Sequence, residues 1–310
     1  MMKRNEILPD NGTGEYYRDC QKNYDVDGIR KMAQHVIDVH CHVYSHAIVP
    51  KAVRAIERFY GHLPGSHQEG VVRALVEDGR KQGTSGYVIH SVATRPEQVS
   101  LINAYFEKWL NKEEYKDELI TFGTLHPKSE HLREDFEELI GMGLKGVKIH
   151  PDFQQFHVDS PEAMQIFEMC EDAGLPILVH TGDFRYDYSN PSRVVPVLKR
   201  FPKLIFIGAH FGGWSVWEEA VRKLSDYPNM WVDTSSSFYW LTPEKATELI
   251  RAYGSERVMF GTDYPMWGRQ EELEYLRRLD LDADEYEDIC WRTCDRIFGL
   301  ISNNNSSSVR

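Results

Sequence analysis

The segment VIDVHCH at residues 36–42 starts with a short apolar run and ends in two histidines that are separated by one residue. Seven more short runs of this kind follow along the chain, each rich in β-branched and other apolar residues. Short, nearly continuous apolar runs are typical of parallel strands that are buried on both faces. The eight predicted strands span 36–40, 87–93, 119–126, 146–150, 176–180, 204–210, 230–235 and 257–263.

The segments between these runs carry signals of helices. EDFEELIGMG (134–143) ends in glycine, a common residue after the last turn of a helix. Ser160-Pro161 and Thr242-Pro243 each place an N-cap residue before a proline at the first helical position. Eight strands that alternate with helices predict an α/β fold, a distorted (β/α)8 TIM barrel forming a single domain. No GxGxxG motif follows the first run, which disfavours a dinucleotide-binding sheet.

Both ends of the chain fall outside the eight units. We expect an N-terminal extension at 1–35 that covers the barrel bottom, a catalytic domain at 36–300 and a disordered tail at 301–310. Within the domain, residues 282–300 have the spacing of a final packing helix. The connection at 47–80 is longer than an ordinary loop between strand and helix, so it is a candidate lid over the active site.

Composition limits the classes of partner. The chain has 310 residues, of which 41% are hydrophobic, and its 48 acidic against 36 basic residues give a net charge of −12. Nucleic acids and anionic membranes favour clustered Lys and Arg, so we expect neither as a partner. Five cysteines without a CxxC pair indicate a reducing compartment, and hence the cytoplasm. The expected partner is a small-molecule substrate, and a homodimer is compatible with this composition.

Polar residues stand at the ends of nearly all the predicted strands. In a barrel these ends converge on one mouth, where catalysis takes place. His40 and His42 are two residues apart on a strand, so both side chains point to the same face. Burying so many polar groups is costly without a bound ion or substrate, so the set predicts a metal site. The further residues at strand ends are His90, His126, Lys148, His150, His180, His210 and Asp263.

Five motifs in these strands resemble those of the amidohydrolase superfamily. They are VIDVHCHVY (36–44), GLKGVKIHPD (143–152), PILVHTGD (176–183), IGAHFGGW (207–214) and MFGTDYPMW (259–267). The most similar branch is the amidohydrolase-related group, which contains predicted TIM-barrel metal-dependent hydrolases and enzymes like aminocarboxymuconate-semialdehyde decarboxylase. The resemblance extends over residues 36–298 and implies a divalent metal ion at the mouth of a TIM barrel.

The resemblance also implies roles for single residues. His40, His42, His180 and Asp263 would be the metal ligands, and His210 would act near the metal-bound water as a base or electrostatic helper. These nitrogen and oxygen ligands favour Zn²⁺, with Mn²⁺, Fe²⁺, Co²⁺ and Ni²⁺ as alternatives.

A metal ion in such a site lowers the pKa of bound water from about 15.7 toward 7. Asp263 can take a proton from that water, and His210 can accept or return one during bond cleavage. The sequence therefore predicts a metal-dependent hydrolase of a small, carboxylate-bearing or cyclic substrate. The alternative is a metal-dependent, non-oxidative decarboxylase, a carbon–carbon lyase of the same fold. A barrel that only binds or stores metal is the third class.

Lys148 leaves three roles open. As a cation it would hold a substrate carboxylate, as a carbamate it would bridge two metal ions, and otherwise it is structural. The branch that the sequence resembles is generally mononuclear, which favours the cation and one ion per chain. The predicted catalytic residues are thus His210, Asp263 and Lys148, and the predicted substrate-binding residues are Lys148, His150, Arg185, Trp214 and Tyr264. So many polar groups at the mouth favour hydrolysis over decarboxylation.

Overall fold

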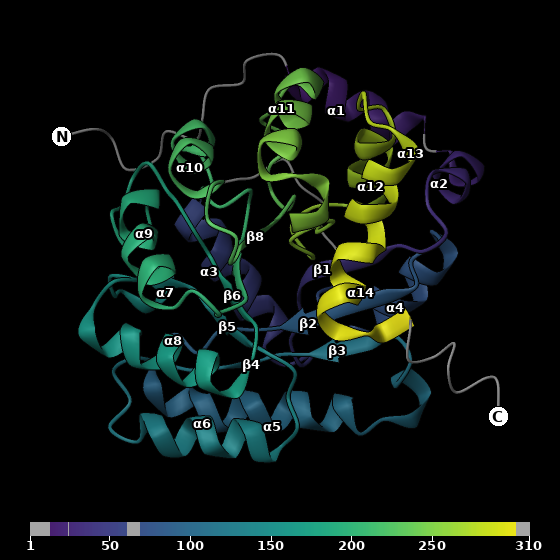
Figure 1. The fold of residues 1–310 in the computed structure, drawn as a ribbon. Helices are drawn as coiled ribbons and strands as arrows, with labels where there is room; N and C mark the ends of the chain where they lie inside the picture. Colours follow the sequence, from purple (N-terminus) through teal and green to yellow (C-terminus); the bar gives the residue numbers. More distant parts are fainter. Residues whose placement is uncertain (1–12, 24, 61–68, 302–310) are drawn as a thin grey trace.

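The computed structural model describes residues 13–23, 25–60 and 69–301 of the chain. Each of the eight predicted runs forms parallel strand structure, which confirms the predicted fold (Figure 1). The third run is divided at Phe122 into two short strands, so the eight runs give nine elements. These are β1 (Ile37–His42), β2 (Gly86–His90), β3 (Leu119–Thr121), β4 (Gly123–Thr124), β5 (Val147–Ile149), β6 (Ile177–Val179), β7 (Phe206–Gly208), β8 (Met230–Asp233) and β9 (Val258–Met259).

The strands close into a distorted barrel. They form one sheet in the order β1-β2-β3 and another in the order β4-β5-β6-β7-β8-β9. Around the break, the amide of Phe122 donates to Ile89 at 3.0 Å while the next amide, of Gly123, donates to Gly146 at 2.9 Å. At the other seam the amide of Val39 donates to the carbonyl of Phe260 at 2.9 Å. The mouth is therefore built on a continuous ring of strands.

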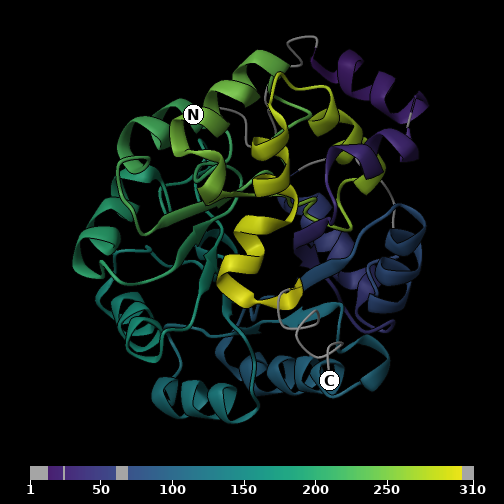
Figure 2. The same cartoon turned by 45° about the vertical axis from the view of Figure 1, so that its right-hand side comes forward.

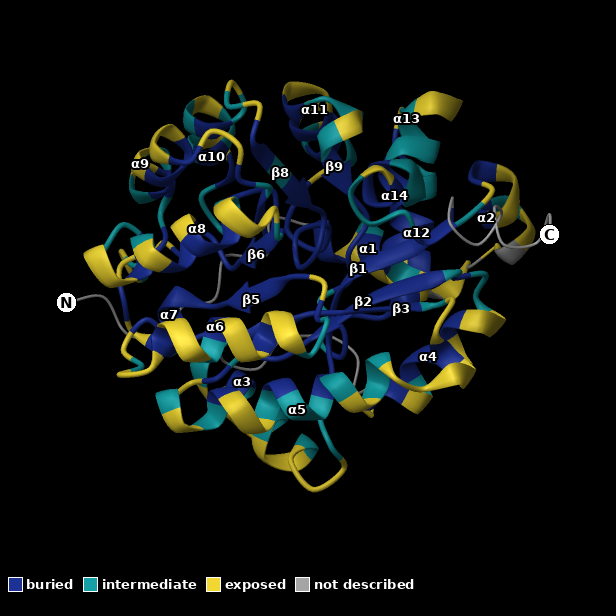
Figure 3. Ribbon diagram, turned by 60° about the horizontal axis from the view of Figure 1, so that its bottom comes forward, coloured by how far each residue is buried: buried dark blue, intermediate teal, exposed yellow. Residues whose placement is uncertain are grey.

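Helices surround the ring, with buried faces toward the strands and exposed faces outward (Figure 3). The predicted N-caps are present, because Ser160 accepts from the amide of Ala163 and Thr242 from that of Lys245. The outer helices are α3 (Val49–Tyr60), α4 (Val72–Lys81), α5 (Val99–Leu110), α6 (Leu132–Gly141), α7 (Pro151–Gln154), α8 (Pro161–Ala173), α9 (Pro191–Arg200), α10 (Trp217–Leu224), α11 (Pro243–Tyr253) and α12 (Arg269–Arg277). None of the helices in the described part of the chain has the length and apolar character needed to cross a membrane.

The described residues of the N-terminal extension, 13–23 and 25–35, pack mainly along α12, whereas the sequence analysis expected the extension to cover the barrel bottom. Its helices are α1 (Thr13–Lys22) and α2 (Val26–Met32), and α1 packs along α12. There the Tyr17 hydroxyl donates to Glu272 at 2.6 Å, and the Tyr17 ring lies edge-on to Trp267. This aromatic contact gives the extension a better place to bury its apolar face than the bottom of the barrel.

The C-terminal segment fills the bottom instead. The predicted helix at 282–300 consists of α13 (Ala283–Glu287), a π-helical turn (Asp288–Arg292) and α14 (Thr293–Phe298). It crosses the centre of the ring in Figure 2, and Leu300 and Ile301 join the apolar cluster inside the strands. The predicted tail after Ile301 and residues 61–68 of the candidate lid lie outside the described residues, while the rest of that connection includes α3 and α4.

Candidate active site

A cavity of about 560 Å³ opens where the carboxyl ends of the strands converge. Its floor is polar and is formed by residues that the sequence analysis singled out. They are His40, His42, Lys148, His150, His180, His210 and Asp263. Strands far apart in the sequence thus bring the predicted site residues into one place.

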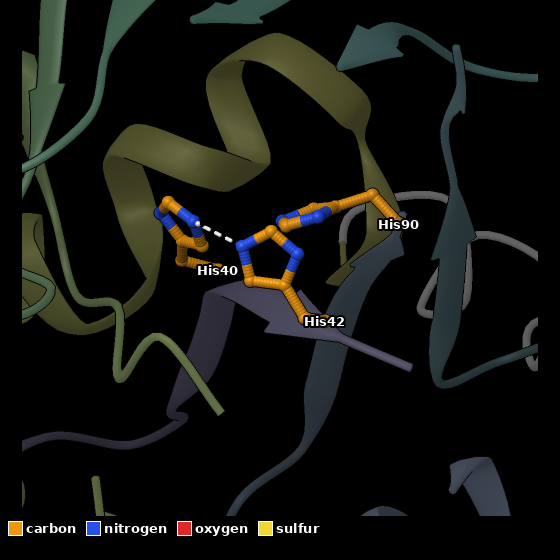
Figure 4. A group of neighbouring side chains, drawn as sticks. All are labelled: His40, His42 and His90. Atoms are coloured by element: carbon orange, nitrogen blue, oxygen red, sulfur yellow. Dashed lines mark hydrogen bonds between the residues drawn. The ribbon is translucent and has the colours of Figure 1, made fainter. Parts of the chain in front are cut away.

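His40 and His42, here called the β1 pair, lie next to the carboxylate of Asp263. The two Nε2 atoms are 3.2 Å apart, as drawn in Figure 4. Asp263 Oδ1 lies 3.4 Å from His40 Nε2 and 3.3 Å from His42 Nε2. Three candidate ligand atoms from β1 and the segment after β9 therefore face a common point.

Asp233, at the end of β8, orients His40 of the β1 pair and was missed in the sequence analysis. Its Oδ2 accepts a hydrogen bond from His40 Nδ1 at 2.8 Å, and its Oδ1 accepts from the amide of His210 at 3.0 Å. Because His40 Nδ1 carries the proton, its Nε2 is unprotonated, and the Nε2 lone pair, on the side of Asp263, is available to a metal ion. A carboxylate behind a histidine is the common arrangement at protein metal sites. The polar end of the WVDTS run (231–235) was the available signal.

His180 and His210 form a second facing pair, here called the β6–β7 pair because the two residues follow those strands. His180 Nδ1 lies 3.0 Å from His210 Nε2. The other ring nitrogens reach carbonyl oxygens, since His180 Nε2 donates to Gly182 at 3.1 Å and His210 Nδ1 to Ser235 at 2.9 Å. In the neutral rings, both facing nitrogens are therefore acceptors.

These contacts fit a divalent cation. The two acceptor nitrogens of the β6–β7 pair face each other at hydrogen-bond distance and need a proton or a metal ion between them, while the nitrogens of the β1 pair face each other and the Asp263 carboxylate. The donor set of imidazoles and one carboxylate suits a divalent transition metal. The structure brings His40, His42 and Asp263 within contact distance, whereas His180 makes its close contact with His210.

Lys148 lies beside the β1 pair in the interior of the barrel. Its side chain is fully buried, and its Nζ is 3.1 Å from His40 Nε2. Burial lowers the pKa of Lys148 to about 8, although the charges of Asp233 and Asp263 favour the ammonium form. Burial and the charge of Lys148 together lower the pKa of His40 to about 3, so this imidazole is neutral at pH 7.

Strained backbone holds two of the floor residues. His210 and Asp263 have φ values of 60° and 61°, in the left-handed region that residues other than glycine seldom adopt. Gly182 has a φ of 76°, and a Cβ on it would lie 2.6 Å from the backbone of Gly213. Only glycine allows these two loops to approach so closely. The surrounding fold fixes the positions of these side chains at the expense of local strain.

His150 and Asp152 support the β6–β7 pair from α7. The rings of His150 and His180 are stacked at 3.8 Å with an interplanar angle of 6°. His150 Nδ1 accepts from the amide of Phe153, so its Nε2 donates to the hydroxyl of Tyr60 at 3.1 Å. Asp152 Oδ2 is 3.5 Å from His180 Nε2. Burial and the nearby charge of Asp183 raise the pKa of Asp152 to about 7.

Arg185 and Tyr264, two predicted substrate-binding residues, have other partners and do not line the cavity. Arg185 donates to both carboxylate oxygens of Asp183, at 2.9 and 2.6 Å, and lies over aromatic rings of α3 and neighbouring loops. Tyr264 accepts a hydrogen bond from the amide of Gly70 at 3.1 Å. Trp214, by contrast, lines the cavity.

The remaining histidines at strand ends differ from each other. His126 Nδ1 accepts from the amide of Lys128 at 3.2 Å, which is a structural role. His90 lies against both rings of the β1 pair (Figure 4), and burial holds its pKa well below the usual range.

The wall above the floor is mainly apolar. Helices α3 and α5 provide most of it, and aromatic rings complete it. Among the described residues, the charged groups that line the cavity are three lysines, Lys51, Lys108 and Lys148, and one carboxylate, Asp263. The apolar and aromatic lining includes Ile48, Ala52, Ile56, Leu101, Ile102, Tyr105, Phe153, Trp214, Trp240 and Trp267. A ligand with an apolar body and a negative charge fits this surface.

A sequence model of one protein family, described as amidohydrolase, matches residues 37–300, which is most of the chain. The chain belongs to the amidohydrolase family. This confirms the resemblance inferred from the strand motifs and establishes the protein as an enzyme of the amidohydrolase superfamily.

Solved structures share the fold of this amidohydrolase. An uncharacterized TIM-barrel protein from Bordetella bronchiseptica is 22% identical, with a TM-score of 0.70 over 86% of this chain and 99% of that chain. A 5-carboxyvanillate decarboxylase from Novosphingobium aromaticivorans, complexed with manganese and 4-hydroxy-3-methoxy-5-nitrobenzoic acid, is 14% identical. Its TM-score is 0.67 over 96% of this chain and 100% of that chain.

One curated relative is similar over a shorter region. Decarboxylase orsB from Emericella nidulans is 26% identical over 121 residues, which are 32% of this chain and 35% of that protein. The aligned part therefore spans about a third of the relative.

Proposed function

We propose that this amidohydrolase is a metal-dependent, non-oxidative decarboxylase of a small carboxylic acid with an apolar or aromatic body. The observation that carries the proposal is the buried polar floor beneath an apolar wall. Lys148 and His40 are fully buried there, and α3 and α5 cover the floor with aliphatic side chains. Loss of a carboxylate charge is favoured where the dielectric constant is low.

The sequence favoured hydrolysis because four polar groups were expected around the substrate. Two of them, Arg185 and Tyr264, have other partners and do not line the cavity. The other two, Lys148 and His150, are buried in the floor. The substrate would therefore have fewer polar groups around it than the sequence indicated, and this less polar cavity supports decarboxylation. Two of the similar proteins, orsB and 5-carboxyvanillate decarboxylase, are named decarboxylases, which supports the same choice.

The metal ion, held by His40, His42, His180 and Asp263, would bind and polarise the acid when present. Lys148 is placed to pair with the substrate carboxylate, and the apolar wall takes the rest of the molecule. The bond between the carboxylate carbon and its neighbour breaks, CO₂ leaves, and the electron pair stays on the remaining carbon. His210, protonated at Nε2 from solvent, gives that carbon a proton. Nitrogen and oxygen ligands suit Zn²⁺, Mn²⁺, Fe²⁺, Co²⁺ and Ni²⁺, so these are the ions to compare.

The test uses metal-loaded protein and a panel of aromatic and muconate-type acids, with small lactones, esters and amides beside them. Turnover of the acids should release one CO₂ per molecule. In D₂O the product should carry one deuterium at the carbon that lost CO₂. Turnover of the lactones, esters or amides alone, without CO₂, would reject decarboxylation and restore the hydrolase.

The proposal also places the protein in a reducing compartment, the cytoplasm. All five cysteines are free and buried, which is typical of cytoplasmic proteins.

A further inference from the structure

His90 is a buried histidine at the end of β2 that the proposed reaction does not use. Its side chain is fully buried, and neither ring nitrogen has a hydrogen-bond partner among the described residues. Each of the other buried histidines in the described ranges has a ring nitrogen in a polar contact. An imidazole buried without partners is costly, which indicates that a bound group completes its surroundings.

The position of His90 points to the group that it meets. Its ring centroid is 4.9 Å from that of His40 and 4.5 Å from that of His42, and both contacts are edge-on. One ring nitrogen from each of the three residues can be chosen so that all lie within 4.8 Å of one another. Nitrogens that bind one ion at about 2.0–2.1 Å lie at most about 4.2 Å apart, so binding requires the side chains to rotate toward one another. Figure 4 shows the His90 ring beside the contact between the other two.

The strands hold this arrangement in place. β1 and β2 are paired in parallel, with His42 directly opposite His90. His90 does not line the cavity, so it approaches the β1 pair from the interior of the barrel. A metal ligand on that side needs no contact with solvent, and it leaves the cavity side of the ion free for a substrate.

We propose that His90 binds the divalent ion together with the β1 pair, adding a ligand from β2 to the predicted set. The proposal rests on the metal site of the proposed function and is independent of the reaction class. It explains why this imidazole is buried against two others without a hydrogen bond of its own.

The test uses the full chain loaded with Co²⁺, a paramagnetic probe that such ligands accept. Affinity is measured by competition with a chelator, and ligating imidazoles are counted by their shifted ring signals in proton NMR. His90→Phe keeps a buried ring but cannot coordinate. It should bind Co²⁺ about 10²-fold more weakly, since even outer-shell partners contribute about 10–100-fold, and should lack one set of shifted signals.

His126→Phe is the matched control, because His126 is also buried at a strand end but lies outside the cluster. It should keep wild-type affinity and the full set of shifted signals. His90→Asn, which is smaller, replaces His90→Phe if that variant does not fold. A folded His90 variant with wild-type affinity and every shifted signal would overturn the proposal. A wild-type chain that does not bind Co²⁺ would reject the metal site itself, and His90's role with it.

Discussion

The β1 pair and the β6–β7 pair look alike in distance but differ in surroundings. In each pair two imidazole nitrogens face each other, at 3.2 Å in the first and 3.0 Å in the second. The β1 pair also faces a carboxylate, Asp263, and an ammonium group, Lys148. The β6–β7 pair is oriented by carbonyl oxygens, and its carboxylates, Asp152 beside His180 Nε2 and Asp233 beside His210, do not lie between the two facing nitrogens.

This difference suggests that the β1 pair is the main binding site of the cation and that the β6–β7 pair provides the group for proton transfer. A carboxylate beside two acceptor nitrogens adds the negative charge that a divalent ion needs. In the second pair no carboxylate lies between the facing nitrogens, so one imidazole, His180, can complete the ligands of the ion while the other carries a proton. We therefore expect the β1 pair and Asp263 to anchor the ion, with His180 as a further ligand, and His210 to carry the proton.

The largest effect is expected from the β1 pair. His40→Ala and Asp263→Ala each remove a predicted ligand, and each should weaken metal binding by more than about 10³-fold, because even outer-shell partners are worth about 10–100-fold. CO₂ release should fall below detection in both variants. Elemental analysis after gel filtration measures the metal content. Full metal content in both variants would show that the ion is held elsewhere.

His210→Asn should have a smaller effect of a different kind. The variant should keep its metal ion while kcat falls by about 10²–10⁴-fold, the usual contribution of general acid–base catalysis. Metal content and kcat measured on the same preparation distinguish the two pairs. Loss of the ion would mean that His210 also binds metal, and its role as the proton carrier would be wrong.

Lys148→Met tests which of its three roles this lysine has. If the ammonium group holds the substrate carboxylate, KM should rise by about 10–100-fold, which corresponds to a lost hydrogen bond to a charged group. The metal content should stay near one ion per chain. Lys51→Met, at the outer part of the cavity, is the control and should change KM much less. A fall from two ions to one or none in Lys148→Met would support the carbamate bridge instead.

Local sequence patterns predicted the strands and most of the floor, because strand periodicity and the barrel mouth follow from short segments. The features that the sequence did not predict depend on contacts between residues that are far apart in the chain. The role of Asp233 depends on His40, 193 residues away, and the place of α1 depends on Tyr17 meeting Glu272, 255 residues away. Arg185 has its partner two residues away, at Asp183. The sequence could not show that neither side chain of this ion pair lines the cavity.

The smallest expected effect comes from Asp152 behind the β6–β7 pair, and it is an effect on stability. Its pKa is about 7 in the fold against an ordinary 3.8, so between these values the folded chain binds more protons than the unfolded chain. Metal-free wild type should therefore lose stability as pH rises from 5 to 7, by about 2–3 kcal/mol more than Asp152→Asn. Urea unfolding at each pH measures the difference. Asp280→Asn, at a side chain that is 98% exposed, should follow the wild type. Parallel curves for wild type and Asp152→Asn would mean that Asp152 is ionised in the fold throughout, and His180 would then have a carboxylate charge beside its Nε2.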